Sequence, residues 1–233
     1  MKGVGGLAPP PVEEEEEEAA ASASHHHVIF IIERACLETA KVGASHRLLN
    51  CDDHQNYISR KGRDPAHYRP DICHQSLLAV LDSPLNKAGK VKAVFVRTEK
   101  NVLIRVSPTT RVPRTFKRFS GLICQLLYKL SIRATNGPDK LMRLVKGPVT
   151  RHLPANCQVI GLSRTAPAAQ RASQLVGALE DERPVAFVVG GFSHGQIEIQ
   201  YADREVSISE YPLSAACCIA KLTSALEEKW GIA

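Results

Sequence analysis

The sequence predicts an α/β domain whose ligand-binding loops follow the carboxyl ends of its strands. Three observations predict it. Short apolar runs alternate with helical segments in the last third of the chain. Residues 28–32 form an unbroken β-branched and aromatic run, typical of a strand buried on both faces of a parallel sheet. Apolar residues make up 44% of the 233 residues, which is enough for a substantial core.

Residues 1–27 lie outside this domain and are predicted to form a disordered acidic, low-complexity tail. They are rich in Gly and Pro and contain a run of six glutamates and three consecutive histidines. Such a segment buries too little apolar surface to offset the entropy of ordering. We therefore expect the folded domain to span residues 28–233.

The charge of the chain is divided unequally between these two parts. The whole chain carries 30 Lys and Arg against 24 Asp and Glu, a net charge of +6. Residues 1–24 hold one of the cations and six of the anions, so the remainder carries 29 against 18, a net charge of +11. A domain this basic predicts a polyanionic partner. Charge alone does not distinguish among RNA, DNA and anionic lipid.

Other compositional signals exclude several classes of protein. No apolar run approaches the roughly 18 residues of a membrane span. The N-terminus also lacks the apolar stretch of a signal peptide, so we expect no membrane partner. The seven cysteines are scattered, odd in number and never spaced as CxxC. This pattern is typical of reduced thiols in the cytosol or nucleus and disfavours a structural zinc site, so we expect no metal.

The first half of the domain is predicted to contain helices, loops and a hairpin. Residues 44–61 are polar with scattered leucines, which favours a helix plus a loop, and residues 62–70 form a turn-rich connection. Residues 72–81 place three leucines on one helical face, and a Ser-Pro step ends that helix. Two apolar runs flank a polar turn in residues 91–106, which predicts a β-hairpin.

The second half is predicted to contain the clearest helix and most of the short strands. Residues 114–133 are amphipathic, with leucine or isoleucine at helical spacing. A short basic helix is expected over residues 139–146. The remaining predicted elements are strands at residues 159–162, 185–189, 196–201 and 206–208 and a final helix at residues 213–230, with Pro212 in its first turn.

A glycine-rich loop is the first candidate for ligand binding. The strand at residues 185–189 runs into the sequence GGFSHG, which begins at Gly190 and ends at Gly195. Glycine lets a backbone approach a ligand closely. The spacing is neither GxGxxG nor GxxxxGK[ST], so a dinucleotide site or a P-loop is not supported. On these residues alone, an ordinary glycine-rich turn explains the segment at least as well as a ligand loop.

The start of the last helix is the second candidate. The sequence from Ile208 to Leu213 is ISEYPL. Ser209 is a candidate helix cap, and free backbone amides at a helix start can bind an acceptor group. An ordinary capped helix start explains the same residues.

A basic segment before residue 119 is the third candidate. Arg111, Arg114, Lys117 and Arg118 precede or begin a predicted helix, with two phenylalanines nearby. Cations oppose the helix dipole at this end, so helix stability does not explain them. Arginine forks suit phosphate oxygens and Phe can stack on bases, so the segment favours RNA binding over a solvated face.

Polar residues at both ends of the helix at residues 72–81 are further candidates. Asp71 is well placed as a helix cap, and His74 is either a general base or a buried structural histidine. The residues alone favour a structural role for both. Asp82 is predicted to hold the following loop through hydrogen bonds to backbone amides. The adjacent Cys217 and Cys218 have apolar neighbours and are predicted to be core residues rather than nucleophiles.

These segments occur together and in one order, and in that combination the chain resembles a known family. The matching blocks are LETAKVG, LLNCDDH, RPDICHQSLL, LDSPLNKAG, NVLIRVSPTTRVPRTFKRFSGL, FVVGGFSHG and VSISEYPLSAA. Over residues 28–233 the chain is similar to the eukaryotic ribosome-biogenesis pseudouridine N1-methyltransferases, enzymes of the SPOUT class. Blocks such as RVPRTFKRF and YPLSAA are too long for a chance match.

The resemblance implies a fold, a cofactor and partners. The fold is an α/β SPOUT-type methyltransferase domain with a C-terminal trefoil knot and an RNA-binding extension. The cofactor is S-adenosyl-L-methionine, and the substrate is small-subunit (18S-type) rRNA. The resemblance also implies a homodimer, pre-ribosomal assembly factors as partners, and a location in the nucleolus and nucleus.

Site residues follow from the resemblance as well. The implied cofactor contacts are Leu162, Gly190, Gly195, Ile208, Ser209, Glu210, Tyr211, Pro212 and Leu213. The implied RNA contacts are Arg69, Arg111, Arg114 and Arg118. The chain departs from the family at Glu210, where the family favours Asn, and mildly at Gly191, where a small residue such as Ala is usual.

The implied chemistry is methyl transfer to N1 of a pseudouridine. In pseudouridine the sugar is attached to C5, so ring N1 carries a hydrogen. Transfer then needs a flipped base with an in-line path to the sulfonium methyl group. The N1–H is weakly acidic, so a carboxylate or an ordered water can remove the proton during transfer. We name Asp71, beside Arg69, as the residue that orients or deprotonates the base. The alternative hypothesis is an RNA-binding assembly factor that acts mainly as a scaffold, with methylation secondary.

Overall fold

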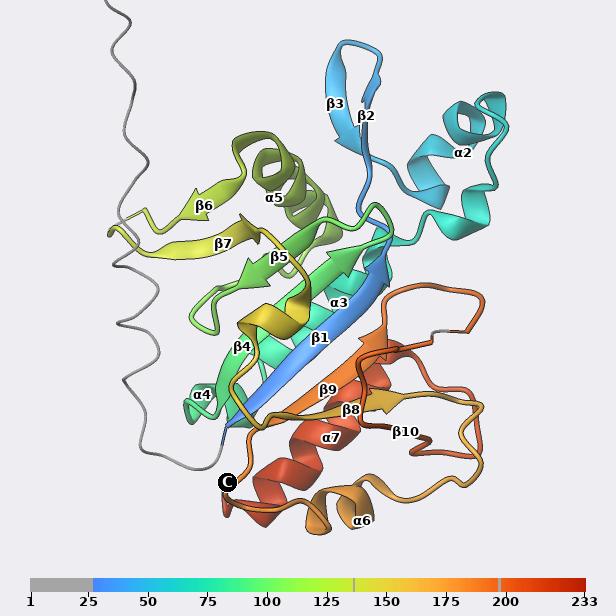
Figure 1. Ribbon diagram of the computed structural model, residues 1–233. Coiled ribbons are helices and arrows are strands. Elements are labelled where there is room, and N and C mark those ends of the chain that lie inside the picture. The colour runs from blue at the N-terminus through green and yellow to red at the C-terminus, as the bar shows by residue number, and fades with distance from the viewer. Residues whose placement is uncertain (1–26, 136, 197) are drawn as a thin grey trace, which may run out of the picture.

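The computed structural model describes residues 27–135, 137–196 and 198–233, which form a domain around one mixed sheet (Figure 1). In spatial order its strands are β10 (Arg204–Val206), β8 (Gln158–Leu162), β9 (Val185–Gly190), β1 (Val28–Ala35), β4 (Val91–Thr98), β5 (Leu103–Val106), β7 (Lys140–Val145) and β6 (Ser131–Arg133). Neighbours from β10 to β4 are parallel, and those from β4 to β6 are antiparallel. The predicted tail lies outside the described residues except for His27.

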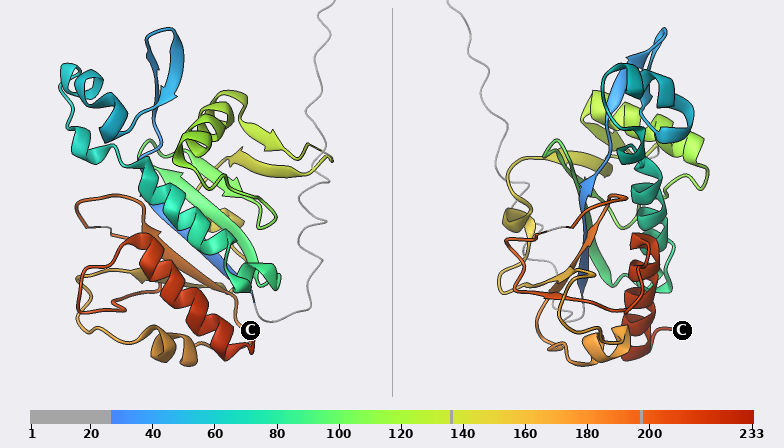
Figure 2. Two further views of the ribbon diagram at one scale, coloured as in Figure 1. Left: turned by 180° about the vertical axis from the view of Figure 1, so that it is seen from behind. Right: turned by 90° about the vertical axis from the view of Figure 1, so that its right-hand side faces the viewer.

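Helices cover mainly one face of this sheet. They are α2 (Cys51–Arg60), α3 (Pro70–Leu81), α4 (Pro84–Lys87), α5 (Phe116–Lys129), α6 (Ala172–Gly177) and α7 (Ala215–Lys229), with the 3-10 turns η2 (Pro65–His67) and η3 (Val149–His152). Helices α3 and α7 pack against each other and lie on the same face of the sheet, as the right-hand view of Figure 2 shows. Within the described ranges, no helix is long and apolar enough to cross a membrane.

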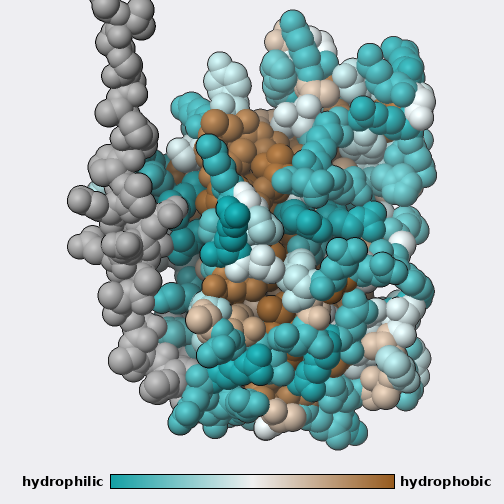
Figure 3. All heavy atoms as spheres, in the orientation of Figure 1, coloured by the Kyte–Doolittle hydropathy of each residue, from teal (hydrophilic) through white to brown (hydrophobic). Residues whose placement is uncertain are grey.

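The opposite face of the sheet has a thinner cover. Strand residues such as Ile29 and Ile31 pack there against η3 and against side chains of residues 199–202. Figure 3 views this face and shows hydrophobic residues between the hydrophilic ones over the central strands. The loops on this face are therefore part of the hydrophobic core.

Strand β1 confirms the prediction of a strand buried on both faces. Phe30 and Ile32 belong to the cluster on the helix side, whereas Ile29 and Ile31 belong to the cluster on the other side. The strand pairs in parallel with both β4 and β9, so its position is central. An unbroken β-branched and aromatic sequence is what such a position requires.

A small extension projects beyond the carboxyl end of β1. It consists of the hairpin β2 (Thr39–Val42) and β3 (Ser45–Leu48), followed by α2 and η2 (Figure 1). Its own small core contains Leu49, Ile58 and Tyr68. The predicted helix plus loop at residues 44–61 is therefore correct only for α2, because β3 precedes it.

Besides residues 44–61, five element predictions differ from the structure. The strand expected at residues 206–208 lies instead at Arg204–Val206. The predicted basic helix at residues 139–146 is wrong, because β7 pairs there with β5 and β6. The predicted strand at residues 196–201 is absent from its described part, 196 and 198–201. Helix α5 is shorter than expected, because Leu130 adopts a left-handed φ of +66° and β6 follows. Pro212 precedes the last helix, which Ser214 caps through the Cys217 amide.

Candidate functional site

Three candidate loops meet at one edge of the sheet. Strands β10, β8 and β9 are adjacent and parallel, so the loops after Leu162, Gly190 and Val206 leave the sheet at the same edge. The first and third loops are hydrogen-bonded to each other, since the Ser163 amide donates to the Val206 carbonyl at 2.9 Å. The fold thus brings together the segments in which cofactor contacts were predicted, at the usual ligand position in an α/β sheet.

Close packing and backbone geometry require the glycines of the second loop. A Cβ on Gly190 would lie 2.8 Å from the Phe192 ring, and one on Gly191 would lie 2.7 Å from a methyl group of Ile32. Gly195 has a φ of +108°, a conformation that residues with side chains rarely adopt. Larger residues at these positions would therefore displace the loop.

Two residues at the end of β1 fasten this glycine loop, and the sequence analysis missed both. The Glu33 carbonyl accepts a hydrogen bond from the Gly191 amide at 2.6 Å. Arg34 places its guanidinium carbon 4.5 Å from the centroid of the Phe192 ring and donates to the Gln196 carbonyl at 3.2 Å. The loop is thus held at its start, at its aromatic residue and at its end.

The Glu33 side chain forms a buried polar cluster behind the loop. It is 1% exposed and is the only buried carboxylate among the described residues. One carboxylate oxygen accepts a hydrogen bond from Arg97 at 2.6 Å, and the other accepts one from the Tyr201 hydroxyl. Burial, and then the bond to Glu33, raises the pKa of Tyr201, which therefore remains a donor at neutral pH. A glutamate ending an otherwise apolar run was the sequence signal for this cluster.

The segment after β10 leaves much of its chain accessible. Ile208 is buried, Ser209 and Leu213 are half-buried, and Glu210, Tyr211 and Pro212 are exposed. Ser209 does not cap the last helix, because its hydroxyl accepts a hydrogen bond from the Tyr211 amide at 3.0 Å within the turn itself. The segment is an ordered loop before α7 rather than the first turn of that helix.

Asp71 and Arg69 form a two-point ion pair at the start of α3. Two guanidinium nitrogens of Arg69 donate to the two carboxylate oxygens of Asp71 at 2.8 and 2.7 Å. Asp71 is not the helix cap that the sequence predicted, because Arg69 occupies the cap position and Pro70 begins the helix. The hydrogen bond to Asp71 raises the pKa of Arg69. Both side chains are about one-third exposed, so a ligand can reach them.

The turn η2 connects this ion pair with the glycine loop. Ser193 Oγ donates to the Ala66 carbonyl at 3.0 Å, which joins residues 127 positions apart in the sequence. Ala66 lies three residues before Arg69. The candidate cofactor loop is therefore tied to the turn that leads directly into the candidate catalytic pair.

The three arginines of the basic segment are all exposed. The helix predicted to start at residue 114 begins at Phe116, so Arg114 precedes α5 and only Arg118 lies on it. Arg114 pairs with Asp82 at 3.0 Å. Asp82 therefore binds the Arg114 side chain rather than backbone amides of the following loop. In that loop Ser83 caps helix α4 instead.

His74 joins α3 to the basic segment. Its Nε2 lies 2.7 Å from the Pro113 carbonyl oxygen, and its ring stacks on Phe119 with the centroids 4.4 Å apart. The side chain is buried, which supports the structural role rather than that of a general base. Helix α3, which carries Asp71 in its first turn, therefore also supports the loop that carries Arg111.

The cysteines offer no activated nucleophile in the core. All seven are free. Burial raises the pKa of Cys73 to about 12 and that of Cys218 to about 11, so both thiols stay protonated at neutral pH. No group of His, Cys, Asp and Glu within the described residues is arranged to hold a metal ion.

Comparison with known proteins identifies relatives along most of the chain. The family model described as EMG1/NEP1 methyltransferase matches residues 30–227. The human protein named ribosomal RNA small subunit methyltransferase NEP1 is 52% identical over 204 residues, which are 88% of this chain and 82% of the human protein. The Caenorhabditis elegans protein named ribosomal RNA small subunit methyltransferase nep-1 is 52% identical over 202 residues, 87% of each chain.

A solved structure shares the fold. The crystal structure of Archaeoglobus fulgidus Nep1 bound to S-adenosylhomocysteine matches with a TM-score of 0.66 at 22% identity, over 88% of this chain and 99% of that chain. This likeness supports the mixed α/β architecture, while the family model and the two relatives determine the family. The chain belongs to the EMG1/NEP1 methyltransferase family.

Proposed function

We propose that the protein is an S-adenosyl-L-methionine-dependent methyltransferase that methylates N1 of a pseudouridine in small-subunit rRNA during biogenesis of that subunit. One observation carries the proposal: in a methyltransferase family member, three loops of adjacent parallel strands leave one edge of the sheet, and the glycine loop among them is hydrogen-bonded to η2, three residues before Arg69. The named relatives, at 52% identity, support rRNA of the small subunit as the substrate class.

The residues of the three loops fit this cofactor. Apart from its chain neighbours, a Cβ on Gly195 would meet only the Phe192 ring, at 3.8 Å, so the loop is open on that side. Residues 210–212 are exposed and offer backbone carbonyls and the amide of Glu210. The assigned contacts are Leu162, Gly190, Gly195, Ile208, Ser209, Glu210, Tyr211, Pro212 and Leu213. The bound cofactor supplies an electrophilic methyl group on a sulfonium centre.

Asp71 acts on the base. Its carboxylate, held at both oxygens by Arg69, accepts a hydrogen bond from N1–H of the flipped pseudouridine. It takes the N1 proton as N1 bonds to the methyl carbon and the methyl–sulfur bond breaks, or it orients the base while a water molecule takes that proton. Arg111, Arg114 and Arg118 bind phosphates of the same RNA along α5 and the loop before it.

The proposal includes a trefoil knot, a homodimer, pre-ribosomal assembly factors as partners and a nucleolar or nuclear location. The resemblance of the sequence blocks supports all four. For the knot, the pairing of Ser207 with Ala169 also supports it, because the chain that leads to α7 lies against the β8–α6 loop. Helix α7 then packs on α6 and α3.

Transfer of a labelled methyl group tests the proposal. The protein is incubated with methyl-labelled S-adenosylmethionine and one of two RNA fragments of the same small-subunit sequence. The fragments differ at a single position, which is pseudouridine in one and uridine in the other. We expect label only in the pseudouridine RNA, and none with Gly190→Val, whose side chain displaces Phe192. Equal labelling of both fragments would contradict N1 specificity. RNA binding without cofactor binding would favour the scaffold alternative.

A further inference from the structure

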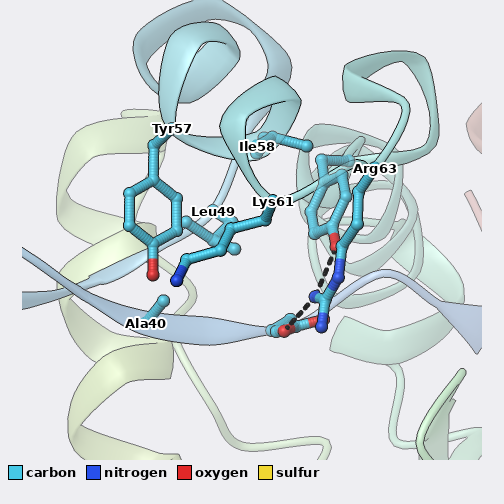
Figure 4. A pocket seen from close by; sticks show the side chains of 8 residues that line it. Ala40, Leu49, Tyr57, Ile58, Lys61 and Arg63 are labelled. Carbon is cyan, nitrogen blue, oxygen red and sulfur yellow. Dashed lines mark hydrogen bonds and ion pairs between the residues drawn. The ribbon is translucent and has the colours of Figure 1, made fainter.

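The extension contains a cavity that the proposed methyl transfer does not use. Its volume is about 210 Å³, and residues of β2, of α2 and of the segment that follows α2 line it (Figure 4). The cavity is lined by Glu38, Ala40, Leu49, Tyr57, Ile58, Lys61, Arg63 and Tyr68. Cavities for drug-sized ligands hold about 300–1,000 Å³, so this one suits a single ring system.

The floor of the cavity is apolar and one wall is aromatic. Leu49 and Ile58 are 2% and 1% exposed and close the cavity from behind. Figure 4 shows the Tyr57 ring on one side and the Ala40 methyl group below it. An apolar floor beside an aromatic ring suits an unstacked nucleobase, because the base can stack on the ring and bury its other face.

The one carboxylate of the cavity is already neutralised. Glu38 accepts hydrogen bonds from Arg63 at 2.7 Å and pairs with Lys100 at 3.0 Å, and Arg63 also bonds the Tyr68 hydroxyl. Burial alone would raise the pKa of Glu38, but the bonds from Arg63 and Lys100 outweigh it and lower that pKa. The cavity therefore does not repel an anionic ligand.

Two donors of the cavity remain available. In the part of the chain that the structure describes, neither the Lys61 ammonium nor the Tyr57 hydroxyl has a hydrogen bond or ion pair. Figure 4 shows the Lys61 amine pointing into the space beside Tyr57. Donors without acceptors select a ligand with carbonyl or phosphate oxygens, and the +11 charge of the body beyond residue 24 favours a polyanion.

The cavity lies next to the proposed path of the RNA. Tyr68 lines it, and the next residue, Arg69, pairs with Asp71. We propose that this cavity takes a looped-out base of the rRNA strand, with the base between Tyr57 and the Leu49–Ile58 floor and Lys61 bound to its carbonyl or phosphate oxygen. The base is a neighbour of the target nucleotide and not the target itself. This inference rests on the proposed function, since it assumes the same RNA.

A cavity-filling variant tests the inference in the full-length protein. Ala40→Ile adds a branched side chain that strand β2 accommodates and that occupies the space of the base. Thr39→Ile is the matched control, because adjacent strand residues point to opposite faces. RNA affinity is measured with a fragment that the wild type methylates and with copies that carry one abasic nucleotide at successive flanking positions.

We expect one abasic position to weaken wild-type binding at least about fivefold, as loss of one base–aromatic stack does. Ala40→Ile should show the same loss with intact RNA and no further loss with that abasic copy, whereas Thr39→Ile behaves as the wild type. Lys61→Gln, at an exposed residue, gives a second variant if Ala40→Ile does not fold. The inference would be overturned if the loss from Ala40→Ile added to the loss from the abasic nucleotide at every position tested. It would also be overturned if Ala40→Ile and Lys61→Gln both bound RNA with full affinity, and a protein side chain would then be the candidate occupant.

The result is separable from the proposed function. If the wild type methylates pseudouridine RNA while Ala40→Ile and Lys61→Gln bind it unchanged, only the base cavity is refuted. If the wild type methylates no RNA, the proposed function is refuted first.

Discussion

Glu33 connects three parts of the molecule on which the site depends. Its carbonyl holds Gly191, and its carboxylate holds Arg97 and Tyr201. A buried carboxylate is strongly unfavourable unless donors surround it, so these contacts support one another. The position of the glycine loop therefore depends on the polar cluster around Glu33.

Removal of one donor from this cluster should weaken the fold. Tyr201→Phe leaves one oxygen of Glu33 without its hydrogen bond, and hydrogen bonds to charged groups contribute about 1.5–3 kcal/mol. We expect a loss of that order in the free energy of unfolding at pH 7, measured by denaturant titration. Tyr128→Phe is the control, because Tyr128 is 86% exposed, and an equal loss in both variants would contradict the role of the cluster.

The same variant predicts a pH dependence. The folded state raises the pKa of Tyr201 above its ordinary 10.0, so the unfolded chain releases this proton first as pH rises. The contribution of Tyr201 is therefore complete below pH 10 and is lost above it. The difference in unfolding free energy between wild type and Tyr201→Phe should narrow from pH 10 upward. A difference that stays constant to pH 11 would refute this assignment.

Asp71 should matter for transfer rather than for cofactor binding. Asp71→Asn removes the negative charge that Arg69 holds in place, and loss of general acid–base or orienting help lowers rates by about 10²–10⁴. We expect such a fall in the rate of methyl transfer, with unchanged affinity for S-adenosylmethionine by calorimetry. The exposed Asp139→Asn is the control. A rate within about twofold of wild type would exclude Asp71 from the reaction.

At the scale of elements, hydrophobic patterns predicted the helices and strands whose conformation depends mainly on their own sequence. The buried strand at residues 28–32, the hairpin at residues 91–106 and the helix at residues 72–81 were all recognisable from hydrophobic spacing. Strand β7 was not, because its conformation depends on pairing with β5 and β6 rather than on its own basic sequence. The candidate loops were found one by one, but their meeting depends on the strand order β10-β8-β9, which no local pattern encodes.

The start of α5 is the element on which RNA affinity should depend. Arg111, Arg114 and Arg118 are exposed at its positive end, where phosphates are also favoured by the helix dipole. Replacing all three with Ala should weaken RNA binding and flatten its salt dependence, because fewer counterions are released. Cofactor affinity should remain, since these residues lie outside the three loops.

Filter binding over a salt series measures this effect. A control variant replaces two exposed arginines outside this segment, Arg171 and Arg204, with Ala. An unchanged slope in the triple variant would mean that the basic segment is only a solvated face. In that case RNA binding would depend on Arg69 or on the basic strand β7.

At the scale of the whole molecule, we expect two copies of the chain to act together. The resemblance places the cofactor pocket beside a subunit interface, so RNA bound by one copy can reach the pocket of the other. Light scattering should give about twice the 25.5 kDa of one chain. A monomer that methylates RNA at the full rate would contradict this prediction.

Hydrogen exchange with and without S-adenosylhomocysteine tests the central claim most directly, because it locates the cofactor on the whole chain. If the three loops form the site, added ligand will slow amide exchange in residues 162–165, 190–196 and 207–213. Exchange in the basic segment and in the cavity of the extension will stay nearly unchanged. Protection confined to other segments, or none at a ligand concentration that saturates binding, would contradict the account.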